Sequence, residues 1–139
     1  MSTNLEKADK IKTHLEFLGY EVLITDGTKE PNGILMIKAL SQAKYNLVMW
    51  FAPSGFIGVR SNWNGMKKMT AVEQWQFVNK CNSDMFMTRL YIDKDGDATF
   101  QCVYVGEYDK TVFGNFVDGM QNDIRAVFND SDVQRLLIA

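Results

Sequence analysis

Cysteine, histidine and proline are all scarce in this chain, and these shortages exclude several classes of protein. Its 139 residues include two cysteines, two prolines and one histidine. Two cysteines are too few for a disulfide-stabilised scaffold. One histidine cannot build a histidine-based metal site without carboxylate or cysteine ligands, and no such cluster stands at ligand spacing. No low-complexity tract or repeat is present, and the sequence therefore predicts a single domain over residues 1–139.

An excess of charge of one sign and a long apolar run are also missing. The net charge is −2 and the sequence pI is about 5.3, which disfavours a generally basic nucleic-acid-binding protein. No run reaches the ~18 apolar residues of a membrane span, and Met1 to Lys12 lacks the apolar core of a signal peptide. We therefore expect a cytoplasmic protein with neither a nucleic acid nor a membrane as its partner.

The first half of the chain predicts one helix and four strands. Thr3 and Glu6 match a capping box, apolar residues then recur every three or four positions, and Gly19 suits the residue after a helix. Turn signals, among them Pro31-Asn32-Gly33, separate four segments rich in strand-forming residues. These predicted strands are Tyr20 to Thr25, Ile34 to Leu40, Tyr45 to Ala52 and Phe56 to Trp63. The third is almost continuously apolar, which predicts a central position in the sheet.

The second half predicts a helix, a hairpin and a long helix. Thr70 and Glu73 form a second capping-box match, followed by an apolar stripe of Val72, Trp75, Val78 and Cys81. Asp95-Gly96 marks a tight turn between two alternating strands. The helix over 111–128 carries a broad apolar stripe (Phe113, Phe116, Val117, Met120, Ile124, Val127 and Phe128). Its glycines, Gly114 and Gly119, indicate close packing against another element.

The element order is therefore α-β-β-β-β-α-β-β-α. Short connections favour antiparallel pairing, and helices and hairpins are segregated rather than strictly alternating. This pattern predicts an α+β fold, an antiparallel β-sheet with helices packed on it.

Residues with reactive side chains have plain structural interpretations. His14 lies off the centre of its helix stripe and is interpreted as a surface histidine. Cys81 and Cys102 stand beside apolar residues and are interpreted as small core residues. The run starting at Asp93 has its glycine at position four rather than six, which indicates a hairpin turn and not a calcium loop. We therefore predict no catalytic residue, no metal and no cofactor.

Aromatic residues are the most distinctive feature. Neighbours in a strand point to opposite faces, so Trp50 or Phe51 leaves the core for a second surface. An exposed aromatic patch would mark a protein-binding site; cover by helices or by a dimer partner is the alternative. The predicted protein-binding residues are Trp50, Phe51, Phe56, Trp63, Tyr91 and Tyr104. Lys67-Lys68 near Arg60 form a small basic spot, interpreted as a solvated loop.

The element order also resembles a known family. A helix ending near Asn79 and Asn82, a strand–Asp-Gly–strand hairpin over 89–100 and a long closing helix resemble the YbjN family of bacterial sensory transduction regulators. The resemblance implies a fold similar to type III secretion chaperones, no catalytic residues and a homodimer that holds an extended client segment. The net charge of −2 is mild for a secretion chaperone and favours the YbjN-like type.

The sequence thus favours a non-enzymatic protein-binding module, chaperone-like or regulatory. Burial of apolar side chains of a partner segment, with strand addition at a sheet edge, would provide the affinity. The predicted dimer-contact residues are Phe113, Phe116, Met120, Leu136 and Leu137. The alternatives are an enzyme or small-ligand-binding protein, with a pocket between sheet and helices near Trp50, Trp63 and Cys81, and a structural subunit of an assembly.

Overall fold

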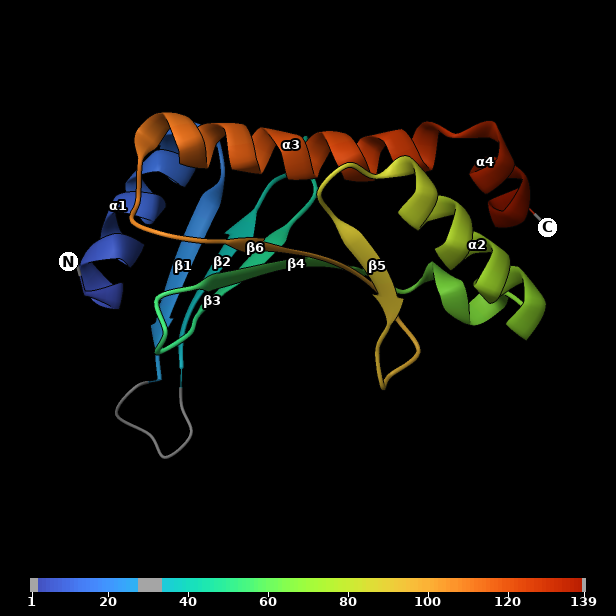
Figure 1. Cartoon of the computed structure of the whole chain (residues 1–139), viewed down its shortest axis with the longest axis horizontal. Coiled ribbons are helices and arrows are strands. Elements are labelled where there is room, and N and C mark those ends of the chain that lie inside the picture. Colours follow the sequence, from blue (N-terminus) through green and yellow to red (C-terminus); the bar gives the residue numbers. More distant parts are fainter. Residues whose placement is uncertain (1–2, 28–33, 139) are drawn as a thin grey trace. The chain divides into compact units, whose positions relative to one another are not determined.

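A computed structural model describes residues 3–27 and 34–138 of the chain and has the predicted α+β fold (Figure 1). One sheet has the strand order β1-β2-β3-β4-β6-β5 and is antiparallel along β1 to β4 and in the hairpin of β5 and β6. The elements are α1 (Asn4–Phe17), β1 (Glu21–Asp26), β2 (Leu35–Leu40), β3 (Leu47–Phe51), β4 (Ile57–Trp63), the 3-10 helix η1 (Gly65–Lys68), α2 (Ala71–Asp84), β5 (Arg89–Ile92), β6 (Ala98–Tyr104), α3 (Lys110–Asn129) and α4 (Ser131–Ile138). The predicted turn at Pro31-Asn32-Gly33 lies outside the described residues.

Contacts within the chain gather in two compact units, and each is discontinuous in sequence. Unit 1 comprises Met1–Arg60 and Val103–Val117, and unit 2 comprises Ser61–Cys102 and Asp118–Ala139. The chain passes from one unit to the other within β4, β6 and α3. The single-domain organisation expected from the sequence stays a prediction.

Helix α1 of unit 1 forms where the sequence predicts it. The Thr3 hydroxyl accepts a hydrogen bond from the Glu6 backbone N–H at 3.1 Å, and Gly19 has the positive φ of +96° that suits the residue after a helix. Ala8, Ile11 and Leu15 are fully buried, while helix and sheet meet along β1 and β2 (Figure 1). Local capping signals therefore fixed both ends of this helix.

Strand alternation in unit 1 separates a covered face of the sheet from an open one. On β3, which is an inner strand as predicted, Leu47, Met49 and Phe51 are buried, while Val48 and Trp50 are half-buried. The antiparallel register places Ile37 beside Met49 and Met36 beside Trp50. Each strand therefore contributes one row of residues to the core and one row to the opposite face.

The first turns of α3 complete the core of unit 1. Phe113 and Phe116 pack edge-on against Tyr104, with ring centroids 5.4 and 5.3 Å apart. The Asp109 carboxylate accepts a hydrogen bond from the Val112 backbone N–H. These contacts bury the apolar stripe of α3 against its own chain.

A buried lysine also stabilises unit 1. Lys7 is almost fully buried, and its Nζ donates to the carbonyl oxygens of Gly55 at 3.1 Å and Gly106 at 3.2 Å. Both bonds are charge-assisted, and they satisfy an ammonium that would otherwise be costly to bury. Lys7 therefore ties three parts of unit 1 together.

Helix α2 of unit 2 begins where the sequence predicts, but the predicted apolar stripe does not form one buried face. The capping box of Thr70 and Glu73 is present. Phe77 and Cys81 are buried, whereas Val72 and Trp75 are exposed, Trp75 to 68%. Val72 and Cys81 are nine residues apart, which is about two and a half turns at 3.6 residues per turn. The two ends of the expected stripe therefore lie on different faces.

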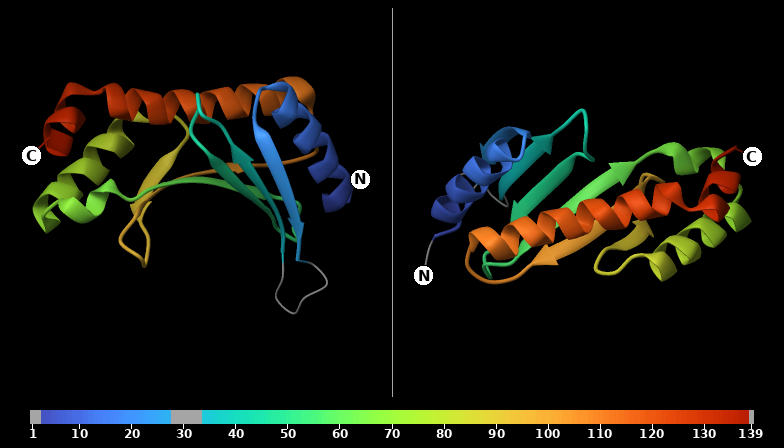
Figure 2. Two further views of the ribbon diagram at one scale, coloured as in Figure 1. Left: turned by 180° about the vertical axis from the view of Figure 1, so that it is seen from behind. Right: turned by 90° about the horizontal axis from the view of Figure 1, so that it is seen from above.

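The C-terminal tail forms an additional helix, α4. Its first backbone N–H groups, those of Asp132 and Val133, donate to Asp130 Oδ1, an N-cap arrangement that the sequence pattern did not predict. Val133 is fully buried. Helices α2 and α4 lie side by side within unit 2 (Figure 2). Of the apolar residues near the C-terminus, Leu136 is half-buried and Leu137 is exposed.

Candidate functional site

The face of the unit 1 sheet that points away from α1 carries apolar side chains and two cations. We call it the open face and define it by Leu23, Met36, Lys38, Val48, Trp50 and Arg60. The register aligns Leu23, Lys38, Val48 and Arg60 in one row across β1 to β4, and Met36 and Trp50 in the next. Leu23 is 53% exposed, and Met36, Val48 and Trp50 are half-buried.

Trp50 lies flat at the centre of the open face. Its ring covers Gly58 on the neighbouring strand so closely that a Cβ at Gly58 would stand 1.9 Å from Trp50 Cζ2. Because glycine has no side chain, the indole can occupy the space directly above Gly58. The ring has no freedom to sink further into the sheet, so its outer surface is presented as a platform.

Arg60 extends this platform. Its guanidinium carbon lies 5.5 Å from the centre of the Trp50 ring, within the range of a cation–π contact. The Arg60 Nε is buried and has no hydrogen-bond partner in the part of the chain that the structure describes. Arg60 lies within β4, inside the predicted fourth strand, and is half-buried on an aromatic ring. Lys67-Lys68, interpreted from the sequence as a solvated loop, instead belong to the 3-10 helix η1.

The predicted aromatic residues divide between surface and core. Phe56 and Tyr91 are exposed, Trp50 and Trp63 are half-buried, and Phe51 and Tyr104 are buried. Phe51 and Tyr104 therefore belong to the core in this structure and not to a binding surface. Alternation predicted that Trp50 and Phe51 face opposite sides, but only the position of the covering helices decides which one points outward.

The residues expected at a dimer contact are mostly interior. Phe113, Phe116 and Met120 are buried within the chain, so these three side chains are covered by their own chain in this structure. Leu136 and Leu137 of α4 instead line a groove of about 610 Å³ in unit 2, together with Trp63 and Met69. Trp63 packs there between Phe77 and Phe128, with ring centroids 5.5 and 5.4 Å away.

His14 is not the solvated surface histidine that its position suggested. It is half-buried, and its Nδ1 lies 2.8 Å from the Tyr108 hydroxyl. Its ring also meets Phe113 edge-on, with centroids 5.4 Å apart. A partner 94 positions away leaves no local signal in the sequence.

The Asp93 segment is a turn, as predicted. Asp93 Oδ1 accepts hydrogen bonds from the backbone N–H groups of Asp95 and Asp97, and Gly96 has a positive φ of +83°. This is the arrangement of a side-chain-stabilised turn. Over residues 3–27 and 34–138, no three His, Cys, Asp or Glu side chains gather in a way that could hold a metal ion.

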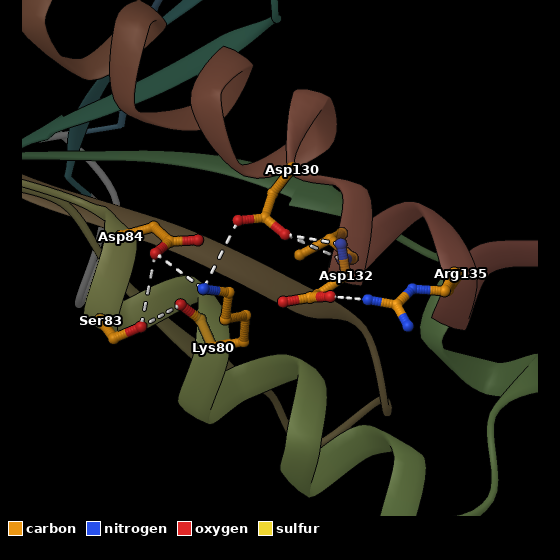
Figure 3. A network of polar contacts seen from close by, with 7 residues as sticks. Lys80, Ser83, Asp84, Asp130, Asp132 and Arg135 are labelled. Atoms are coloured by element: carbon orange, nitrogen blue, oxygen red, sulfur yellow. Dashed lines mark hydrogen bonds and ion pairs between the residues drawn. The ribbon is translucent and has the colours of Figure 1, made fainter.

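Lys80 is the centre of a polar network in unit 2 (Figure 3). Its Nζ lies 3.3 Å from Asp84 and 3.6 Å from Asp130. The hydrogen bond with Asp84 and the charges of both carboxylates raise the pKa of Lys80, and a hydrogen bond with Asp84 lowers the pKa of Asp130. A lysine base or nucleophile needs a lowered pKa, and the shift at Lys80 is in the opposite direction. The network links α2 to Asp130, the residue that precedes α4.

The two cysteines are buried, as the sequence predicted, and no disulfide joins them. Burial, with the charges of Asp84 and Asp130, raises the pKa of the Cys81 thiol to about 12. The thiolate is the reactive form, so Cys81 is held in its unreactive state at neutral pH.

A Cys102→Ala variant, which leaves Cys81 as the sole thiol, therefore reacts slowly with an aromatic disulfide reagent at pH 8. We expect a rate about a hundredfold or more below that of the same variant unfolded in guanidinium, because both burial and the raised pKa suppress the thiolate. Absorbance of the released thiolate measures both rates. Equal rates would show that Cys81 is accessible and activated, and would favour the enzyme alternative.

Asn82 has a structural role that explains one residue of the family resemblance. Its side-chain amide donates to the Leu90 carbonyl at 3.1 Å, and its Oδ1 accepts from the Leu90 N–H at 2.7 Å. Both bonds satisfy backbone groups on the outer side of the edge strand β5. Asn79 is exposed. Asn82 therefore closes this edge, whatever the ancestry of the motif.

Comparisons with protein-family models, with curated proteins and with solved structures gave no match. The YbjN-like resemblance stays a prediction. Within the described ranges, 3–27 and 34–138, no helix combines the length and the apolar character needed to cross a membrane.

Proposed function

We propose that this chain is a non-enzymatic protein-binding module that holds an extended segment of a partner protein on the open face. The observation that carries the proposal is the Trp50 platform, with Arg60 stacked on it and its Nε without a partner among the described residues. Tryptophan and arginine dominate the energetics of protein interfaces. An aromatic platform beside an incompletely paired guanidinium is therefore suited to a partner side chain.

The chemistry of the open face indicates the kind of segment that it would bind. Leu23, Met36, Val48 and Trp50 offer apolar surface, and the cations Lys38 and Arg60 lie in one row across the strands. In a segment that alternates apolar and acidic residues, the apolar side chains would be buried against the sheet, and the acidic side chains would pair with Lys38 and Arg60. We infer such a segment as the ligand class.

The free edge of unit 1 is suited to assist this binding. Among the described residues, β1 lies at the end of the strand order and pairs with β2 alone, so an added strand could pair at its outer side. The other edge strand, β5, is capped by Asn82 at Leu90. Strand addition at β1 would place the partner beside Leu23, at the border of the open face.

The directions in which the pKa values of Cys81 and Lys80 are shifted support binding rather than catalysis. The raised pKa values of Cys81 and Lys80 keep a thiol protonated and an amine charged, and these are the unreactive forms of both groups. A cytoplasmic chaperone-like or regulatory role, as the YbjN-like resemblance implies, would use the same open face.

A displayed library of twelve-residue peptides, selected on the purified chain, tests the proposal. We expect selected peptides to alternate apolar and acidic residues. Trp50→Ala should weaken their binding by about thirtyfold and Arg60→Gln by about tenfold, the scale of 2 and 1.4 kcal/mol at an interface centre. Isothermal calorimetry measures both changes, and thermal unfolding confirms that each variant is folded.

Trp75→Ala is the matched control, because Trp75 is an exposed tryptophan on α2 of unit 2. It should change peptide affinity less than twofold, within the usual range for a residue outside the contact. If Trp75→Ala weakens binding and Trp50→Ala does not, the open face is not the site. If sedimentation shows a dimer that Trp50→Ala abolishes, the segment bound there belongs to a second copy.

A further inference from the structure

A groove of about 540 Å³ lies in unit 1 between α1 and the segment that leads into α3. Lys10, His14 and Phe17 of α1 line one side, and Tyr108 and Lys110 line the other. This volume falls in the range of small-ligand sites. The groove is separate in position from the residues that define the open face.

The floor of the groove is held in place by several contacts. The Tyr108 hydroxyl lies 2.8 Å from His14 Nδ1, and the rings of both residues contact Phe113, with centroids 5.8 and 5.4 Å away. Gly114 lies next to the imidazole, and a Cβ there would meet its Cε1 and Nε2 at 3.5 Å, an ordinary van der Waals distance. A floor fixed in this way costs little conformational entropy when a ligand binds.

One wall is apolar and unusually exposed. Phe17, in the last turn of α1, is 83% exposed, and nothing in the capping of the helix requires an aromatic residue at this place. Phe17 and Tyr108 both line the groove, and their rings provide two flat surfaces for a planar ligand. The apolar part of a ligand would therefore lie against Phe17 and Tyr108.

Positive charge dominates the rim. Lys10 and Lys110 are exposed and form no ion pair within the part of the chain that the structure describes. The carboxylate of Asp9 also borders the groove, which leaves two lysines against one acidic residue. In a chain with net charge −2, this local balance favours an anionic ligand.

We propose that this groove binds a small organic anion that carries a planar aromatic or apolar ring, with the ring against Phe17 and Tyr108 and the acid group at Lys10 and Lys110. Carboxylates and sulfonates share this chemistry. The site is independent of the partner-binding role, and neither requires the other.

The single histidine of the chain provides a direct test, because its Hε1 proton gives one NMR signal. Naphthalene-2-sulfonate is titrated into the full chain at constant pH, with the naphthylmethylammonium cation as the control of the same ring. We expect the sulfonate to shift the His14 signal saturably and the cation to leave it in place. No shift at about 5 mM sulfonate, or an equal shift with the cation, would overturn the proposal.

Charge variants separate this site from general surface binding. Lys10→Gln combined with Lys110→Gln should weaken sulfonate binding by about fivefold, the effect of roughly 1 kcal/mol from exposed ion pairs. Lys12→Gln, a lysine of the same helix that does not line the groove, is the matched control and should leave the affinity unchanged. Equal weakening by both variants would contradict the assignment.

Discussion

Asp123→Ala is expected to destabilise the chain by about 3 kcal/mol, the largest loss of stability that we predict for a single substitution. The buried Asp123 carboxylate accepts hydrogen bonds from three consecutive backbone N–H groups, those of Phe86, Met87 and Thr88, each at 2.9 Å. Alanine would leave these donors without an acceptor, and an unsatisfied buried group costs about 1–3 kcal/mol.

Urea unfolding, followed by circular dichroism, measures this change. Asp123→Asn keeps one acceptor oxygen and should fall between the wild type and the alanine variant. Asp118→Ala is the control, since Asp118 is an exposed carboxylate about one and a half turns earlier on α3. A loss below about 1 kcal/mol for Asp123→Ala would mean that water replaces the carboxylate at these three donors.

Gly58→Ala is expected to destabilise the chain by about 2 kcal/mol and to weaken peptide binding at the open face. The new methyl group would stand 1.9 Å from Trp50 Cζ2, so the indole must leave its place. Displacement of the ring also breaks its contact with the Arg60 guanidinium, which lies 5.5 Å from the ring centre. Stability and binding should therefore fall together.

Gly114→Ala is the matched control for Gly58→Ala. A Cβ at Gly114 meets the His14 ring at 3.5 Å, an ordinary contact, and alanine is favoured over glycine inside a helix by up to about 1 kcal/mol. We expect Gly114→Ala to stabilise the chain and to leave peptide binding intact. If Gly58→Ala is tolerated as well as Gly114→Ala, the Trp50 ring does not rest on Gly58.

Local signals predicted the elements because their causes are local. Thr3 and Thr70 cap helices through bonds to residues three positions away, and Gly96 has the positive φ that its turn requires. The close packing predicted at Gly119 is also confirmed, since a Cβ there would lie 2.6 Å from Met87 Sδ. Such features depend on short spacings or on the absence of a side chain, and a sequence displays both.

The candidate site is formed by contacts between residues of different strands, which sequence patterns do not reveal. The neighbours of Trp50, which are Met36, Gly58 and Arg60, come from adjacent strands whose register only the folded sheet defines. Likewise, the stripe of α3 was correctly predicted to be apolar, but its partner is the chain itself, as the contacts of Phe113 and Phe116 with Tyr104 show. Period and composition indicate which residues are buried but not what covers them.

Fluorine NMR of the chain labelled with 5-fluorotryptophan tests the central claim most directly. The three tryptophans, Trp50, Trp63 and Trp75, give three signals, which single Trp→Phe variants assign. A peptide selected on the chain should shift the Trp50 signal in proportion to occupancy and leave the Trp75 signal in place. A peptide that binds while the Trp50 signal stays unchanged would contradict the assignment of the open face as the binding site.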